Sequence, residues 1–193
     1  YMNDKDYIHE VVNGDIHTTN QIAAGLESRD ESKTFIYAFI YGAGSKKIGS
    51  IIGGSERDGE RIKEKFLRAT PSLRSLREKV ERIASRRWVR GLDQRKIIIR
   101  YPHAALNTLL QGAGATVMKY ALTLLEEYVS INKIKAYPVV NVHDEFQYEV
   151  EESKTEQFGK LAVQSIIEAG KQLNVRCPLN AKYKVGNNWS ETH

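Results

Sequence analysis

Four side chains suited to one elongated ligand follow each other at intervals of four residues. They are two cations and two aromatic rings: Arg29, Lys33, Tyr37 and Tyr41. On an α-helix each step of four residues drifts by only about 40°, so the four project from one broad face. The cations suit a triphosphate, and the rings suit a sugar and a base. The row therefore predicts a nucleotide-binding helix over residues 29–41, although an ordinary amphipathic helix with solvated cations explains the spacing alone.

A second motif changes this balance. Residues 143–145 are His-Asp-Glu and lie between apolar runs, which predicts a β-hairpin over about 137–150 with two carboxylates at its tip. Neighbouring strand residues face opposite ways, so one of Asp144 and Glu145 is expected to be the main ligand of a metal ion. Hard oxygen ligands suit Mg²⁺, whereas an acidic turn in water is the alternative for the pair alone. Together, hairpin and helix indicate phosphoryl or nucleotidyl transfer.

A third row also steps by four residues and consists of His103, Asn107 and Gln111. In the minor groove of a DNA duplex, every base pair presents acceptors at nearly equivalent places. The amides of Asn107 and Gln111 can donate to those acceptors without selecting a sequence. An enzyme that checks the shape of a base pair needs such contacts; a plain polar helix face is the alternative.

The charge of the chain is concentrated in one block. Residues 57–100 contain 15 Lys or Arg and 6 Asp or Glu, a net of +9, whereas the whole chain carries +5 and the remainder therefore −4. Such a block predicts contact with a nucleic-acid backbone, and a solvated helix pair is the alternative. No apolar run approaches the roughly 18 residues of a membrane span, so no membrane partner is expected. The polar N-terminus shows no signal peptide, and the single Cys177 fits a reducing cytoplasm.

The order of the predicted elements indicates an α+β protein with two subdomains, because the first half is mostly helical and the second packs strands with helices. Predicted helices cover about 8–25 with a break at 13–14, 29–41, Ser55 to about 69, 71–83, 102–128, and a segment that begins at a capping box of Ser153 and Glu156. Asp15 is a candidate cap after the break, and the helix at 71–83 carries one apolar stripe that is expected to face inward: Leu73, Leu76, Val80 and Ile83. Predicted strands cover 94–100, the hairpin at 137–150, and 180–185.

The chain resembles the C-terminal part of a family A (DNA polymerase I-like) DNA polymerase, of the replicative type found in short-tailed phages. The helix pattern Arg-x3-Lys-x3-Tyr-x3-Tyr-Gly and the His-Asp-Glu hairpin are specific when they occur together. The matching stretches follow the family order and are residues 13–18, 29–44, 47–49, 91–93, 102–112, 142–145 and 186–189.

The resemblance implies a helical fingers subdomain at residues 1–105 and the C-terminal part of a palm subdomain, an antiparallel hairpin with flanking helices, at 106–193. It implies attack of a primer 3′-hydroxyl on the α-phosphate of a dNTP with release of pyrophosphate. Two Mg²⁺ ions would take part, with Asp144 as a palm ligand and Glu145 as its supporting acid. The second ion needs an aspartate outside this chain.

The resemblance also assigns contacts to the incoming nucleotide. Arg29 and Lys33 match the cations that hold the triphosphate, and Lys33 is a candidate proton donor to pyrophosphate. His17 matches a histidine that assists there. Tyr37 matches the residue against the deoxyribose, where Tyr rather than Phe implies tolerance of dideoxynucleotides.

Further matches concern the primer and the template. Tyr41 and Gly42 match the site where the template base stacks and turns. Asn107 and Gln111 match minor-groove contacts, and His103 stands where many relatives have Arg. His143 matches a contact to the primer terminus. The implied partners are primer-template DNA and dNTPs.

One departure concerns completeness. Relatives carry a further metal-binding aspartate upstream of the position that matches Tyr1, and Asp4, Asp6 and Asp15 do not fit its pattern. We therefore expect a fragment that needs the remaining N-terminal part of the polymerase, in the same or a separate chain, and that is inactive alone. The expected location is the cytoplasm, which is the host cytoplasm for a viral protein. The alternatives are a non-catalytic nucleic-acid-binding remnant and a relative of single-subunit RNA polymerases.

Overall fold

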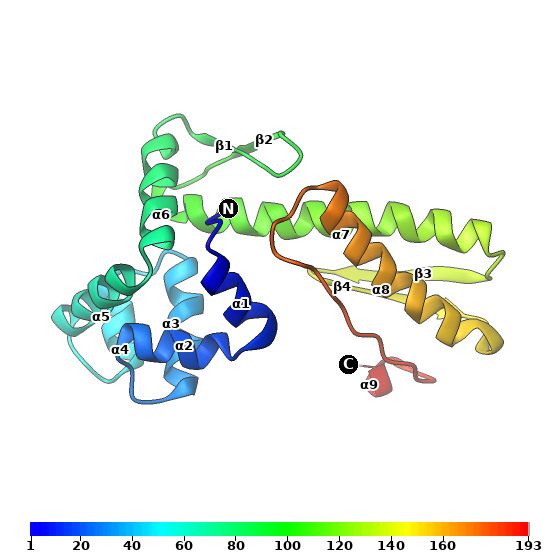
Figure 1. The fold of residues 1–193 in the computed structure, drawn as a ribbon, viewed down its shortest axis with the longest axis horizontal. Coiled ribbons are helices and arrows are strands. Elements are labelled where there is room, and N and C mark those ends of the chain that lie inside the picture. Colours follow the sequence, from blue (N-terminus) through cyan, green and yellow to red (C-terminus); the bar gives the residue numbers. More distant parts are fainter. Residues whose placement is uncertain (193) are drawn as a thin grey trace. The chain divides into compact units, whose positions relative to one another are not determined.

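The computed structural model describes residues 1–192, which form two compact units. The first unit contains Tyr1–Leu110 and the second begins at Gln111. Figure 1 shows helices as the main elements of both units, with one two-stranded antiparallel hairpin in each. The prediction of an α+β fold with a C-terminal hairpin between helices is confirmed. Within the described residues, no helix combines the length and apolar character that crossing a bilayer requires.

The first unit begins with six helices, and local side-chain caps explain where four of them start. Asp4, Asp15, Ser28 and Ser55 each accept a hydrogen bond from a backbone N–H in the first turn of the helix that follows. Ser28 and Ser55 form reciprocal capping boxes. The helices are α1 (Lys5–Asn13), α2 (Ile16–Ala24), α3 (Arg29–Ile40), α4 (Ser45–Ile51), α5 (Glu56–Ala69) and α6 (Pro71–Ala84).

The core of these helices is aromatic at its centre. Phe35 and Phe39 project from α3 toward α5, where Phe66 meets both rings nearly edge-on, at centroid distances of 5.2 and 5.4 Å. All three side chains are buried. Edge-to-face pairs of this kind add to the free energy gained by burial, so this cluster fixes α3 against α5.

The chain then leaves the helices for a short hairpin. Strand β1 (Trp88–Arg90) pairs antiparallel with β2 (Lys96–Ile98), and the single-turn helix η1 (Pro102–Ala104) leads into α7 (Ala105–Ile131). Strand β1 and helix α4 were not predicted. The predicted inward position of Ile83 is wrong, because its side chain is exposed and Ala84 is buried instead.

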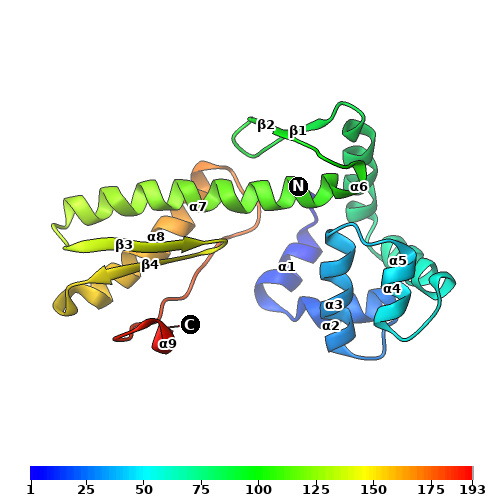
Figure 2. The same cartoon turned by 180° about the vertical axis from the view of Figure 1, so that it is seen from behind.

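The second unit packs a hairpin against long helices. Strand β3 (Ala136–Val142) pairs with β4 (Glu145–Val150), and η2 (Glu152–Lys154) leads to α8 (Thr155–Gln172). Helix α8 crosses one face of this hairpin, as Figures 1 and 2 show from opposite sides. Its inward residues pack on the hairpin and on α7: Phe158, Ala162, Ile166 and Ala169. A short helix, α9 (Trp189–Thr192), ends the described part.

Two local predictions in this unit are wrong. The Ser153 hydroxyl donates to Glu151, and Lys154 occupies the N-cap of α8, so the predicted capping box is absent. Residues 180–185 form no strand, because this segment is attached to α8 by side chains and not by backbone pairing. Tyr183 lies over Gly159, and its hydroxyl donates to Glu156 at 2.7 Å.

Candidate nucleotide-binding and catalytic residues

Helix α3 presents its cations and one tyrosine on the exposed side. Arg29 is its first residue, and Lys33 and Tyr37 follow on successive turns, all three exposed. The helix ends at Ile40, and Tyr41 is its C-cap, 56% exposed. The opposite side is buried against the core: Ser32, Phe35, Ile36 and Phe39. The buried side therefore fixes the direction in which the exposed row projects.

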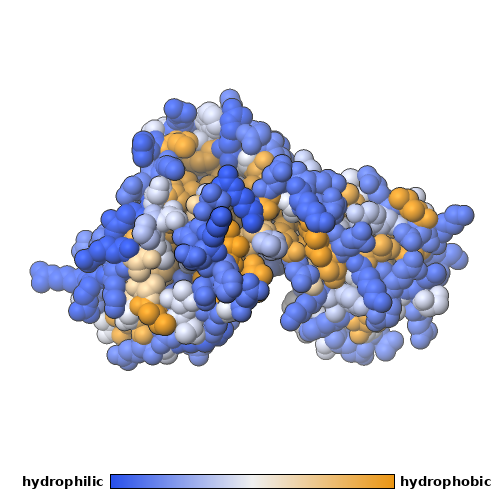
Figure 3. Space-filling model, in the orientation of Figure 1, coloured by the Kyte–Doolittle hydropathy of each residue, from blue (hydrophilic) through white to orange (hydrophobic). Residues whose placement is uncertain are grey.

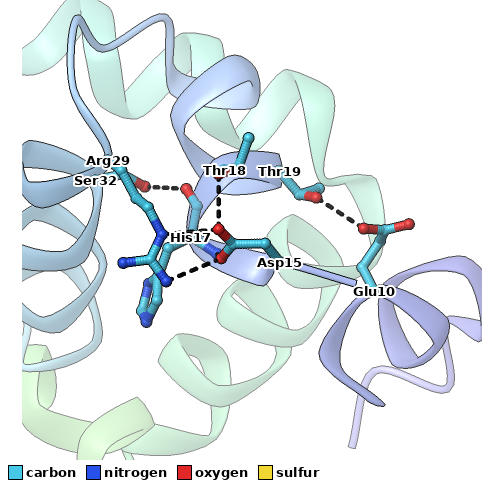
Figure 4. Close-up of polar contacts among 7 residues, drawn as sticks. All are labelled: Glu10, Asp15, His17, Thr18, Thr19, Arg29 and Ser32. Atoms are coloured by element: carbon cyan, nitrogen blue, oxygen red, sulfur yellow. Dashed lines mark hydrogen bonds and ion pairs between the residues drawn. The ribbon is translucent and has the colours of Figure 1, made fainter. Parts of the chain in front are cut away.

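The guanidinium of Arg29 is held by the carboxylate of Asp15, the N-cap residue of α2 (Figure 4). Its Nε donates to Oδ2 of Asp15 at 2.7 Å, and its Nη2 donates to Oδ1 at 3.2 Å. The same carboxylate caps α2, because it also accepts from the backbone N–H of His17 and from the hydroxyl of Thr18. The hydrogen bonds from Arg29 and Thr18 hold the pKa of Asp15 far below its usual value. Asp15 is therefore a fixed anion beside His17.

The end of α3 packs closely on η1. Gly42 has a φ of +77°, and a Cβ on it would lie 2.3 Å from the carbonyl oxygen of His103. Only glycine fits this position. A cavity of about 210 Å³ opens beside it, and its lining includes Phe39, Gly44, Lys63, Arg77 and Glu81. Arg77 lies over the ring of Phe39 at 5.5 Å and pairs with Glu81 at 2.7 Å.

Two predicted site residues carry buried polar atoms without partners. They are Nδ1 of His17 and Oδ1 of Asn107, and no other buried side-chain nitrogen or oxygen within residues 1–192 lacks a hydrogen bond. Folded proteins pair nearly all such atoms, so each exception requires an explanation. His17 lies in the first turn of α2, and Asn107 lies in the first turn of α7, one helical turn before the exposed Gln111.

The tip of the second hairpin carries the predicted acidic residues. Val142 pairs with Glu145, so His143 and Asp144 form the two-residue turn, and both are exposed. His143 has a φ of +53°, a conformation that costs a non-glycine residue roughly 1 kcal/mol or more. Glu145 is half-buried, and its Oε1 accepts a hydrogen bond from Nε2 of Gln147 at 2.6 Å. The two carboxylates therefore differ: Asp144 is exposed in the turn, whereas Glu145 is half-buried and hydrogen-bonded to Gln147.

The donor chemistry at this tip fits a hard cation in part. Asp144 and Glu145 offer carboxylate oxygens, which Mg²⁺ prefers. Across the described part of the chain, no three His, Cys, Asp or Glu side chains are placed to hold a metal ion together. Mg²⁺ usually keeps waters and binds substrate phosphates in addition to one or two carboxylates. The hairpin is thus suited to form one side of a magnesium site.

The basic block lies on α5, α6 and the first hairpin. Figure 3 shows that hydrophilic residues cover most of the surface seen in that view, with smaller apolar areas between them. Several cations of the block take part in local contacts; for example, Lys96 lies over the ring of Trp88 at 4.9 Å. Others are exposed: Arg82, Arg86, Arg87 and Arg100.

Three residues beside the predicted site were not among the predicted contacts. Asp15 was expected only as a cap, although it lies two positions before the motif residue His17. Ser32, fully buried, donates to the carbonyl oxygen of His17 at 2.8 Å. Gln147 supports Glu145. Asp15 and Gln147 could have been found because each lies two residues from a predicted site residue. Ser32 could have been found because it is a polar residue on the apolar face of its helix.

The sequence family described as DNA polymerase family A matches residues 1–191. The chain belongs to this family. Among curated relatives, the DNA-directed DNA polymerase of Enterobacteria phage T3 is 42% identical to this chain, over 97% of this chain and 30% of that protein. The DNA-directed DNA polymerase of Escherichia phage T7 matches with the same identity and coverage.

This family A chain thus spans about 30% of the length of these relatives. A solved structure has a similar fold: the POL domain of Pol1 from M. smegmatis in complex with DNA primer-template and dNTP, with a TM-score of 0.77 at 19% identity. The similarity covers 87% of this chain and 34% of that one. The expected fold and the expected family are both confirmed.

Proposed function

We propose that this chain supplies the nucleotide-binding fingers, residues 1–105, and the C-terminal part of the palm, residues 106–193, of a DNA-directed DNA polymerase. Its partners are primer-template DNA, dNTPs and the remaining part of the polymerase. The proposed setting is the cytoplasm of a bacterial host, since both relatives are polymerases of phages named after bacteria and the single Cys177 fits a reducing cytoplasm.

One observation carries the proposal. The two buried side-chain atoms that lack partners within residues 1–192 belong to His17 and Asn107. The resemblance to family A polymerases implies that His17 lies at the triphosphate and that Asn107 lies at the minor groove of the primer-template. In a bound complex, a phosphate oxygen would accept from a protonated Nδ1 of His17, and the amino group of a guanine in the minor groove would donate to Oδ1 of Asn107. Such a ligand explains why both atoms are left without partners, because unsatisfied buried groups are costly.

The exposed row of α3 is suited to the nucleotide. Arg29 and Lys33 would bind the β- and γ-phosphates and stabilise the charge that develops on pyrophosphate. Lys33 is exposed and has no ion pair within the described residues, so its Nζ is available to give a proton to the leaving group. Tyr37 would pack against the deoxyribose and exclude water from it. His17 would bind the triphosphate beside Arg29.

The remaining residues would bind the DNA and the metal. Tyr41 and Gly42 would meet the template base, and His103, Asn107, Gln111 and His143 would contact the template and primer. Asp144, with Glu145 behind it, would hold Mg²⁺ at the primer terminus. When bound, Mg²⁺ lowers the pKa of the primer 3′-hydroxyl and neutralises charge on the phosphates.

Primer extension tests this proposal. The chain is mixed with an N-terminal polymerase fragment that carries the thumb and the other part of the palm, with Mg²⁺ and dNTPs. We expect synthesis from the mixture and none from either part alone. Asp144→Asn should abolish synthesis, whereas Glu149→Gln, an exposed carboxylate on the same strand pair, should not. Synthesis that survives Asp144→Asn contradicts the proposal, as does a preference for rNTPs over dNTPs.

A further inference from the structure

The ion pair between Asp15 and Arg29 uses only one edge of the guanidinium. Asp15 accepts from Nε and from Nη2, the side edge of the group. Nη1 has no partner within residues 1–192, and Figure 4 shows it directed away from Asp15. A guanidinium has five N–H donors in a rigid plane, so the end edge, formed by the two terminal nitrogens, keeps donors for a second anion.

Asp15 itself is immobilised from the other side. Its two oxygens also accept from the backbone N–H of His17 at 3.1 Å and from the Thr18 hydroxyl at 2.9 Å. Helix α2 is in turn joined to α3 by the hydrogen bond from Ser32 to the carbonyl oxygen of His17. The carboxylate therefore has a fixed position relative to α3. Its two hydrogen bonds with Arg29 then fix the position of the guanidinium as well.

Stability alone does not account for this arrangement. The side chains of Arg29 and Asp15 are 52% and 44% exposed. Exposed ion pairs contribute little to folding, because water screens them and two flexible side chains lose freedom. The N-cap of α2 would be equally well supplied by Asn or Ser, which accept the same backbone hydrogen bond. The charge of Asp15 thus has its clearest effect on Arg29.

We propose that Asp15 is a positioning residue for nucleotide binding, which holds Arg29 by its side edge and leaves the end edge directed at the triphosphate. The inference rests on the proposed function, in which Arg29 binds that triphosphate. A free arginine side chain loses many rotamers when it binds a phosphate, and Asp15 fixes the rotamer in advance. An end-on, two-point contact to phosphate oxygens then forms without rearrangement.

The opposite effect is the main competitor. If Asp15 occupied the guanidinium in place of the phosphate, its removal would tighten nucleotide binding. The direction of the change in affinity therefore decides between positioning and competition. Asp15→Asn is the most suitable variant, because asparagine keeps the cap of α2 and removes the charge. Asp15→Ser serves as a second variant with the same property.

The experiment is a titration of the purified chain with dATP and Mg²⁺, followed by NMR through the Nε–H signals of arginine. We expect both Asp15 variants to raise the dissociation constant about 3- to 10-fold, a typical coupling between contacting residues. Asp4→Asn, which alters the cap of α1, should leave the constant unchanged within about two-fold. In an Arg29→Ala background, Asp15→Asn should cause no further loss. Thermal melting confirms that each variant is folded.

The outcomes separate the two proposals. Tighter or unchanged binding by folded Asp15 variants overturns the positioning role, provided that Arg29→Ala weakens binding. A further loss in the Arg29→Ala background also overturns it, since Asp15 would then act without Arg29. If Arg29→Ala itself leaves dATP binding unchanged, the nucleotide role of α3 fails and the positioning role fails with it.

Discussion

The hydroxyl of Ser32 donates a hydrogen bond of 2.8 Å to the backbone carbonyl oxygen of His17, and this bond joins α3 to α2. Ser32 is fully buried, so water cannot replace the bond when the hydroxyl is removed. We expect Ser32→Ala to lower the free energy of unfolding by about 1 kcal/mol. Urea unfolding measures this, with Ser50→Ala as the control, because Ser50 makes an exposed bond within one helical turn. Equal losses in both variants would mean that the interhelical bond has no special weight.

Substitution of three glycines by alanine can distinguish the cost of backbone strain from the cost of a steric clash. Gly42 has a positive φ and no room for a Cβ; Gly53 has a positive φ of +63° but open space; Gly44 has neither restriction. We therefore expect alanine to destabilise most at Gly42, by about 1 kcal/mol at Gly53, and hardly at all at Gly44. Thermal and urea unfolding of the three variants check the order. A Gly42→Ala protein as stable as Gly44→Ala would show that η1 moves away readily.

Tyr148 should make the second unit sensitive to alkaline pH. Burial and its 2.8 Å hydrogen bond to Glu126 raise the pKa of this phenol well above its usual value. The neutral phenol is thus favoured in the folded state, so its stabilisation is complete below the unfolded pKa near 10 and is lost as the pH rises above it.

Replacement of this phenol should remove both the stabilising hydrogen bond to Glu126 and the loss of stability at alkaline pH. We expect Tyr148→Phe to cost about 0.5–1 kcal/mol at pH 7, and to lose less stability than the wild type between pH 9 and about pH 11. The control is Tyr137→Phe, an exposed residue on β3. Urea unfolding at several pH values provides the measurement, and parallel pH profiles for all three proteins would refute the assignment.

Tyr37 offers a test of the sugar contact. In the assembled polymerase, we expect Tyr37→Phe to raise discrimination against dideoxynucleotides, because the phenol is proposed to lie against the deoxyribose. Competition between ddNTP and dNTP during primer extension measures the ratio. Tyr183→Phe serves as the control, because the Tyr183 hydroxyl donates to Glu156 on α8. Unchanged incorporation of both nucleotides by Tyr37→Phe would count against the contact.

Helix boundaries were predictable where a cap lies within four residues of its partner. Asp15 marked the start of α2, and Ser55 marked the start of α5, since each accepts a hydrogen bond from a backbone N–H two or three residues ahead. The exposed row on α3 also followed from its period. These signals are local and depend little on the rest of the fold.

Features that depend on tertiary contact were missed. Strand β1 exists because it pairs with β2, and its three residues carry no periodic pattern of their own. Residues 180–185 had a strand-like composition but found no backbone partner. The ion pair of Arg29 with Asp15 joins residues 14 positions apart on two helices, and only the packing of α2 on α3 determines that distance.

The edge-on contacts of Phe66 with Phe35 and Phe39 also limit how α3 can move. If α3 moved alone, Phe35 and Phe39 would lose their contacts with Phe66 on α5, and water would not replace these contacts. We therefore expect any closing motion over a nucleotide to carry α3 and α5 together as one rigid block. The backbone would then bend in segments outside α3 and α5.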